Sequence, residues 1–231
     1  MERTMSRITL AATVVAAAMF GAATATAQSS AVRSTSVSST SKPFDAEDLT
    51  TGLSLGVYTM AAGGVSITGR SVDGTFHTNL GEGAGVTIGY GLNRIFSAYA
   101  SLDVAKQPVA QDVDYSGTFG LAHFEVGARV NVPVGSPKAV PYVSASVGGR
   151  ALAARATDEF TGDPVLMSFS GQVYVVGGGI QYFVSPRLAF DAGAELGMGS
   201  FNRYKDDAGD HTIHVNSSTS TRVRFGLNWH P

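Results

Sequence analysis

The chain has 231 residues, no cysteine and a formal net charge of −2. A near-neutral chain lacks the basic surface typical of nucleic-acid binding, and a chain without cysteine has no disulfides. Charged residues make up only 15% and glycine contributes 28 residues. After the N-terminal segment no run of 18 apolar residues occurs, so we expect no transmembrane helix. Together these features favour an all-β protein.

The N-terminal residues 1–27 have the layout of a cleaved signal peptide. Arg3 and Arg7 form a basic start, residues 8–20 are apolar, and residues 25–27 are a small-x-small cleavage site. The alternative is a retained N-terminal anchor. Residues 28–50 are rich in Ser and Thr, which predicts a flexible leader because they cannot bury enough apolar surface to become ordered. We expect one barrel domain over residues 51–231.

Apolar residues alternate with small or polar residues in eight runs after Thr51. The runs cover about 53–58, 83–92, 96–104, 122–132, 143–151, 174–182, 188–198 and 221–229. A period of two indicates β-strands, and runs of about ten residues suit tilted strands that cross a bilayer. Short links around 93–94, 133–141 and 185–186 alternate with long polar links at about 61–82, 106–118, 157–170 and 202–218. This order predicts an eight-stranded antiparallel up-and-down transmembrane β-barrel with both ends of the barrel domain at the rim of the short turns.

The polar parity of the runs is a poor water-facing surface, because it consists mostly of Gly, Ser and Ala. It also carries balanced charges: Asp103, Glu125, Asp191 and Glu195 against Arg129, Arg150, Arg222 and Arg224. We predict that these eight residues form a structural ion-pair network inside a narrow lumen; the alternative is a gate. The apolar parity has no charged residue in the runs and is expected to face lipid, in contrast to a soluble barrel with an apolar interior. His123 lies on the lumen parity and is predicted to contact Glu125 or a tyrosine.

Aromatic residues gather near both ends of the predicted strands, as in the interface girdles of membrane barrels. Near the short-turn rim they are Tyr90, Phe96, Tyr142, Tyr182 and Trp229. Near the loop rim they are Phe119, Tyr174, Phe201 and Tyr204. We predict that all of them contact the membrane interfaces.

With its signal-peptide layout, its eight runs, its glycine-rich lumen parity and a last run ending Phe225-Gly226-Leu227-Asn228-Trp229, the chain resembles the small bacterial outer-membrane β-barrels of the OmpA/OmpX type. The resemblance covers about residue 51 to the end. It implies a place in the bacterial outer membrane, short periplasmic turns and four long extracellular loops. It also implies contact with outer-membrane lipid and lipopolysaccharide, and recognition of the last strand by the barrel-assembly machinery. We expect a monomer without a cofactor.

Three functions are compatible with this resemblance. We favour a structural or loop-mediated interaction role, in adhesion or envelope integrity, without enzymatic activity. The first alternative is a small porin-like channel or transporter for low-mass solutes. The second is a lipid A-modifying enzyme, for which His211, His214, Ser217 and Ser218 are close in sequence but form no recognisable nucleophile motif. Asp206, Asp207 and Asp210 do not have the spacing of an EF-hand loop, so we predict no metal site. No ligand of the loops follows from the sequence.

Overall fold

The computed structural model describes residues 49–231, apart from 64, 70–71, 78, 109–117, 133, 137, 158–163 and 207–208. The predicted signal peptide and nearly all of the predicted leader lie outside the described residues. By its contacts the chain divides into residues 1–41 and 42–231, and the second unit holds all the described residues. In this described part, every helix is too short or too polar to cross a bilayer.

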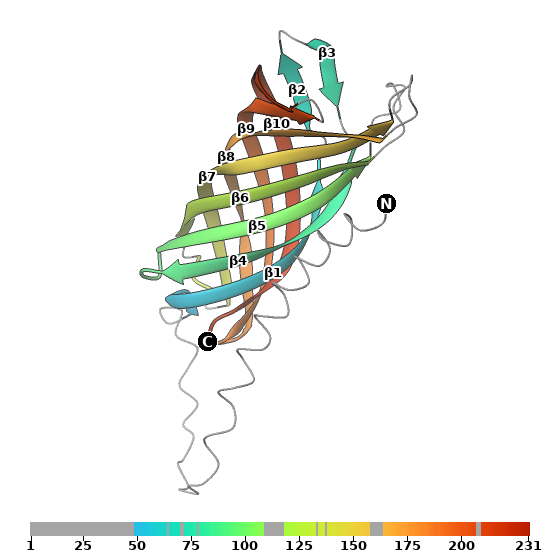
Figure 1. Ribbon diagram of the computed structural model, residues 1–231. Coiled ribbons are helices and arrows are strands. Elements are labelled where there is room, and N and C mark those ends of the chain that lie inside the picture. Colours follow the sequence, from blue (N-terminus) through green and yellow to red (C-terminus); the bar gives the residue numbers. More distant parts are fainter. Residues whose placement is uncertain are drawn as a thin grey trace, which may run out of the picture. The chain divides into compact units, whose positions relative to one another are not determined.

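Ten strands make up the described fold (Figure 1). They are β1 (Gly52–Ala62), β2 (Ser66–Gly69), β3 (Val72–His77), β4 (Gly81–Gly91), β5 (Phe96–Pro108), β6 (Thr118–Asn131), β7 (Ala139–Thr157), β8 (Pro164–Ser185), β9 (Leu188–Asp206) and β10 (Gly209–Trp229). β1 and β4 to β10 pair antiparallel in chain order, and β1 also pairs with β10 from Leu55–Trp229 to Ala62–Arg222. This last pairing closes an eight-stranded barrel, which confirms the predicted fold class.

One end of the barrel, which we call the turn rim, carries the links 92–95, 132–138 and 186–187 together with the start of β1 and the end of β10. The link between β4 and β5 shows why such links are tight. Asn93 Oδ1 accepts hydrogen bonds from the backbone N–H groups of Ile95 and Phe96, both at 2.8 Å. A side-chain acceptor of this kind replaces a backbone partner and stabilises a short turn.

The opposite end, which we call the hairpin rim, contains more strand than the sequence predicted. β9 runs to Asp206 and β10 begins at Gly209, so most of the loop predicted at 202–218 is paired strand. β8 begins at Pro164, and the predicted link 61–82 contains the β2–β3 hairpin, whose β2 pairs with β10. The apolar alternation identified only the lipid-level part of each strand, since strands beyond a bilayer need no apolar face.

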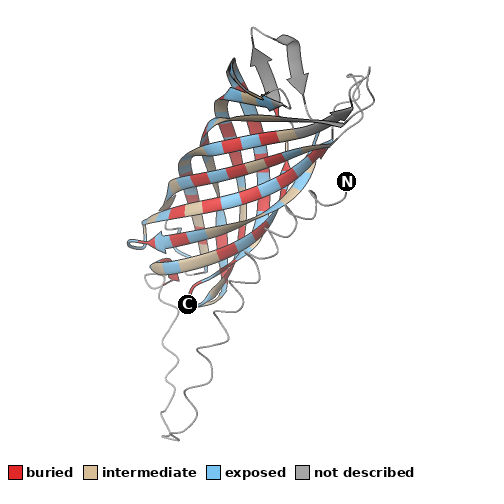
Figure 2. Cartoon of the chain, viewed as in Figure 1, coloured by how far each residue is buried: buried red, intermediate tan, exposed pale blue. Residues whose placement is uncertain are grey.

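Side-chain burial alternates along the barrel strands (Figure 2). On β10, Arg222 and Arg224 are buried while Val223 and Phe225 are exposed. On β8 the outward positions from Tyr174 to Val184 carry no charge, and ten residue steps correspond to about 33 Å along a strand. At the tilt usual for membrane barrels this is about 25 Å along the bilayer normal, which matches the apolar band of such barrels. The outward faces therefore have the height and chemistry of a lipid contact.

Candidate functional site: the ion pairs of the lumen

The structure places all eight charged residues of the predicted network inside the barrel. Seven are buried, and the side chain of Arg129 is 11% exposed. They come from β5 (Asp103), β6 (Glu125 and Arg129), β7 (Arg150), β9 (Asp191 and Glu195) and β10 (Arg222 and Arg224). They form two groups, around Arg222 and around Asp191, with Arg150 outside both.

Arg222 is the centre of the larger group. Its Nη1 lies 2.8 Å from Asp103 Oδ2, and its Nη2 lies 2.9 Å from Glu195 Oε2 and also donates to Glu125 Oε1. Arg224 adds a contact of 2.9 Å between its Nη1 and Glu195 Oε1. Two guanidinium groups thus hold three carboxylates, from β5, β6 and β9. Buried carboxylates are tolerated only when such partners are present.

Three further side chains contact these carboxylates. Tyr58 donates its hydroxyl to Asp103 Oδ2 at 3.2 Å, and Ser146 donates to Glu125 Oε2 at 2.9 Å. His123 Nδ1 lies 3.0 Å from Asp103 Oδ1. The prediction that His123 contacts Glu125 or a tyrosine is therefore wrong. The physical reason is register, because His123 is the direct cross-strand partner of Asp103.

Asp191 is the centre of the second group, nearer the turn rim. Tyr142 donates its hydroxyl to Asp191 Oδ1 at 2.9 Å, and the amides of Gln181 and Asn228 each donate to Oδ2 at 3.1 Å. Arg129 Nη1 lies 3.4 Å from the same oxygen, and its guanidinium carbon is 3.9 Å from the centre of the Tyr142 ring. Four side chains thus donate to this one carboxylate.

Arg150 differs from the other lumen cations. Its Nη2 donates only a long hydrogen bond, 3.4 Å, to the backbone oxygen of Ser218, and its guanidinium lies 4.4 Å from the centre of the Phe201 ring. Within the described part of the chain, its Nε and Nη1 have no hydrogen-bond partner and no carboxylate pairs with it. Arg150 therefore contributes charge to the lumen but no specific ion pair.

Apolar clusters fill the lumen on both sides of the ion pairs. At the hairpin rim the cluster consists of Tyr58, Met60, Ala62, Val65, Ala105, Leu121, Leu152 and Phe201, with Phe119 and Phe169 packed against it. At the turn rim it consists of Leu49, Val140, Phe183 and Ala189. A hollow beside Arg129, Asp191 and Arg224 has a volume of only about 10 Å³, room for at most one water.

Four of the five aromatics predicted at the turn rim are exposed on the outside: Tyr90, Phe96, Tyr182 and Trp229. Tyr142 is the exception, and the prediction for this residue is wrong. Tyr142 lies inside the lumen, and only 3% of its surface is exposed. Tyr142 has the same parity along β7 as Ser144 and Arg150, so it must face inward. Glycine makes room for it, because a Cβ at Gly179 or Gly193 would lie 2.5 or 2.8 Å from the tyrosine hydroxyl.

At the hairpin rim, two of the predicted interface aromatics also face inward. Phe201 is buried and Phe119 packs against the same apolar cluster. Tyr174 is exposed as predicted. Of the residues weighed for metal binding or lipid A chemistry, Asp207 and the side chains of Asp206, Asp210, His211 and His214 lie outside what the structure describes. In the part that it does describe, no three His, Asp or Glu side chains are placed to hold a metal ion.

The network also contains four polar residues that were not predicted to belong to it: Tyr58, Gln181, Asn228 and Ser146. All four lie on the lumen parity, and the first three are large polar residues next to glycine-rich positions. That combination is the signal that could have identified them, since a large inward side chain needs small neighbours in a narrow barrel.

Comparisons with known proteins agree with this geometry at the level of the fold. No protein-family model matches the chain, and no curated protein matches it in sequence. Among solved structures, the chain is similar to Neisserial surface protein A (TM-score 0.52, 15% identity, covering 78% of this chain and 97% of that one). It is also similar to Ail, the attachment invasion locus protein of Yersinia pestis (TM-score 0.52, 15% identity, 78% and 98% covered).

A major outer membrane protein from Thermus thermophilus gives a similar result, with a TM-score of 0.51, 11% identity, and 77% of this chain and 99% of that one covered. At such low identity these similarities concern the fold alone. The chain has the fold of the small outer-membrane β-barrels.

Proposed function

We propose that this chain is an integral protein of the bacterial outer membrane, exported by a signal peptide over residues 1–27, with a structural or interaction role and no enzymatic activity. The observation that carries this proposal is the filled lumen. Arg222 joins carboxylates from β5, β6 and β9 across the barrel, and apolar clusters lie on both sides of these ion pairs. Such a lumen stabilises a closed wall, and the hollow beside Arg129 and Asp191 has room for at most one water.

The outward faces support insertion into a membrane. Val57, Ile88, Phe124, Val147 and Phe225 are each about half exposed or more. In water, an apolar surface that continues around a whole barrel would cause aggregation. In a bilayer the same surface is the expected lipid contact, and insertion would be assisted by the barrel-assembly machinery.

The hairpin rim supports the interaction part of the role. β7, β8, β9 and β10 each have 19 residues or more, about twice what a tilted strand needs to cross a bilayer. The β2–β3 hairpin adds further strands to β10 at this end (Figure 1). Backbone that extends so far beyond the apolar band would project from the cell surface, where it can contact another cell or a soluble partner.

Complementation of a deletion strain tests this proposal. We expect the strain to become more sensitive to detergent or large antibiotics, or to lose adhesion, and the wild-type gene to restore the lost property. A second gene would encode the same barrel with residues 66–77 and 203–216 replaced by short turns. Rescue of envelope integrity by this trimmed barrel assigns the role to the barrel wall, whereas failure despite normal insertion assigns it to the hairpins. A deletion strain unchanged in both properties would contradict the proposal.

A further inference from the structure

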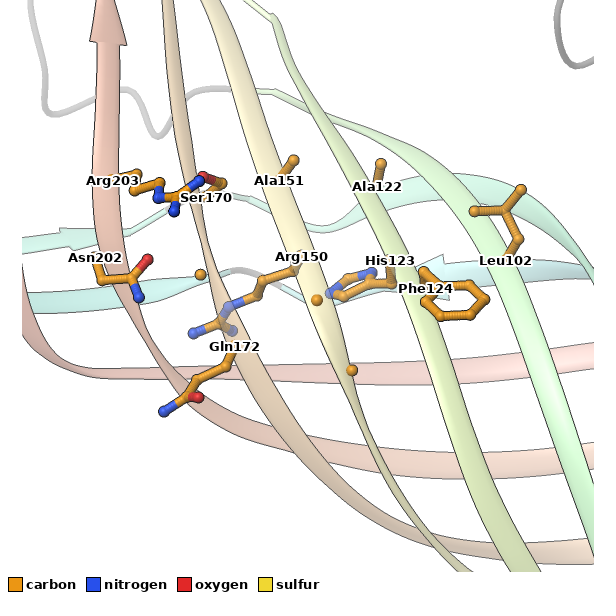
Figure 3. A pocket seen from close by; sticks show the side chains of 13 residues that line it. Leu102, Ala122, His123, Phe124, Arg150, Ala151, Ser170, Gln172, Asn202 and Arg203 are labelled. Atoms are coloured by element: carbon orange, nitrogen blue, oxygen red, sulfur yellow. The ribbon is translucent and has the colours of Figure 1, made fainter. Parts of the chain in front are cut away.

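The outer surface of the barrel has a hollow of about 490 Å³ across β5 to β9, at the hairpin-rim end of the apolar band (Figure 3). The register of the strands shows which outward residues lie side by side beneath this hollow. Leu102, Phe124, Gly149 and Gln172 are consecutive cross-strand partners and form one outward row. The next row toward the hairpin rim consists of Val104, Ala122, Ala151, Ser170 and Arg203. Glycine and alanine at the middle of both rows leave the space that larger side chains fill elsewhere.

The two sides of this hollow differ in chemistry. Figure 3 shows Leu102 and Phe124 on one side and Ser170, Gln172, Asn202 and Arg203 on the other. On the β5–β6 side the outward residues stay apolar up to Val104, whereas on the β8–β9 side they become polar one row earlier, at Gln172. The hollow therefore crosses the boundary between the apolar band and the polar rim.

Exposed cations lie along the hairpin-rim edge of the hollow. Arg203 is exposed, and its register partners, Ser170 and Thr212, are not acidic. The following row begins with Lys106 and ends with Lys205, both exposed, with Gly120, Ala153 and Ser168 between them. The register places Glu82 opposite Lys106 and Asp210 opposite Lys205, so of these three cations only Arg203 has no acidic register partner.

We propose that this hollow binds one molecule of a phosphorylated glycolipid, the lipid A part of lipopolysaccharide. One acyl chain would lie over Gly149 and Ala151 against Phe124. Arg203 would hold a phosphate through charge-assisted hydrogen bonds, and the amides of Asn202 and Gln172 would bind sugar hydroxyls. The glycolipid is favoured over a phospholipid because the hollow lies at the hairpin rim, which faces the outer leaflet, and because two amides beside one cation suit a sugar phosphate. The inference rests only on the membrane placement within the proposed function.

One variant removes the positive charge proposed to bind the phosphate, and a second fills the space proposed for the acyl chain. Each has a matched control. Arg203→Gln removes the charge, and Arg187→Gln removes an exposed cation at the turn rim. Gly149→Leu fills the hollow, and its Cβ would meet no atom closer than 3.9 Å, so the strand can accept it. Ala98→Leu adds the same outward bulk near the turn rim. Folding of each variant is verified by its shifted band on an unboiled detergent gel.

Native mass spectrometry of the full mature barrel, with purified bisphosphorylated lipid A added, measures the binding. We expect one lipid A to bind the wild type. Arg203→Gln and Gly149→Leu should each weaken binding about tenfold or more, as loss of one charge-assisted contact or of the acyl site predicts. Arg187→Gln and Ala98→Leu should bind as the wild type does, and phosphatidylcholine or phosphate-free lipid A should bind at least fivefold more weakly. The proposal would be overturned if the wild type did not bind lipid A, or if the control variants lost as much affinity as the site variants. It would also be overturned if phosphate-free lipid A bound as tightly as the bisphosphorylated form. These outcomes do not depend on the complementation experiment.

Discussion

Arg222 on β10 and Asp103 on β5 belong to strands that do not pair with each other, yet their side chains meet across the lumen with Nη1 and Oδ2 2.8 Å apart. The same guanidinium contacts Glu125 and Glu195. Substitution of Arg222 by Met would leave buried carboxylates with too few positive partners. Removal of one partner of a buried ion pair costs about 3–5 kcal/mol, so we expect a loss of that size in the free energy of unfolding.

Urea unfolding in detergent micelles measures this loss, and the temperature at which the folded gel band disappears gives an independent value. Arg187→Met is the control, because Arg187 is exposed in the turn between β8 and β9. A wild-type stability of Arg222→Met would show that the ion pairs do not hold the barrel together.

Arg150→Met should behave in the opposite way. No carboxylate of the described residues pairs with Arg150, and two of its nitrogen atoms have no hydrogen-bond partner there. The loss of hydration of this buried charge is therefore not offset by an ion pair. The Met side chain keeps the apolar contact with Phe201. We expect a stability within about 1 kcal/mol of the wild type, or higher, by the same urea titration. A loss as large as that of Arg222→Met would contradict this account of Arg150.

Tyr142→Phe tests the inward position of this tyrosine. The substitution removes the hydroxyl that donates to Asp191 Oδ1 and keeps the ring beside Arg129. A hydrogen bond to a buried charged group contributes about 1.5–3 kcal/mol, so we expect a loss in this range. Tyr90→Phe is the matched control, because Tyr90 is exposed on the outside and should lose less than about 0.5 kcal/mol. Equal losses in the two variants would place both tyrosines in the same environment.

His230 makes the stability of the barrel depend on pH. It follows β10 at the turn rim, where burial and the positive charge of Arg129 lower its pKa below the ordinary value of 6.5. The unfolded chain therefore takes up a proton near pH 6.5 that the folded barrel does not, and stability falls as the pH drops below this value. We expect a lower gel-shift temperature at pH 5.5 than at pH 8, and a smaller difference in His230→Phe, whose ring can still pack near Phe183. An unchanged pH dependence in the variant would exclude His230 as the cause.

The alternation in the sequence predicted the barrel and its inward charges because the parity of a strand residue determines the side that it faces. The same rule places Tyr142 inward. Tyr142 was instead predicted to face the membrane interface because it lies near the turn rim, where other aromatic residues face outward. Which lumen side chains contact each other was harder to predict from the sequence. The pairing of His123 with Asp103 depends on the register between β5 and β6, which alternation alone does not define.

The outer hollow was beyond prediction for the same reason. Gly149 and Arg203 are separated by 54 positions, and they come together only through the pairings of β7 with β8 and β8 with β9. The extent of the strands at the hairpin rim was missed because those segments mix apolar and polar residues without a regular period of two, as in the run from Val165 to Phe169. Beyond the apolar band, backbone pairing continues without any hydrophobic pattern to indicate it.

We infer that the lumen is closed by its own side chains. Single-channel recording of the purified mature barrel in a planar lipid bilayer measures whether ions pass through it. The ion pairs around Arg222 and the apolar clusters at both ends predict no steady conductance at voltages where the bilayer itself is stable. Reproducible, long-lived current steps from the wild-type protein would contradict the claim and favour a channel.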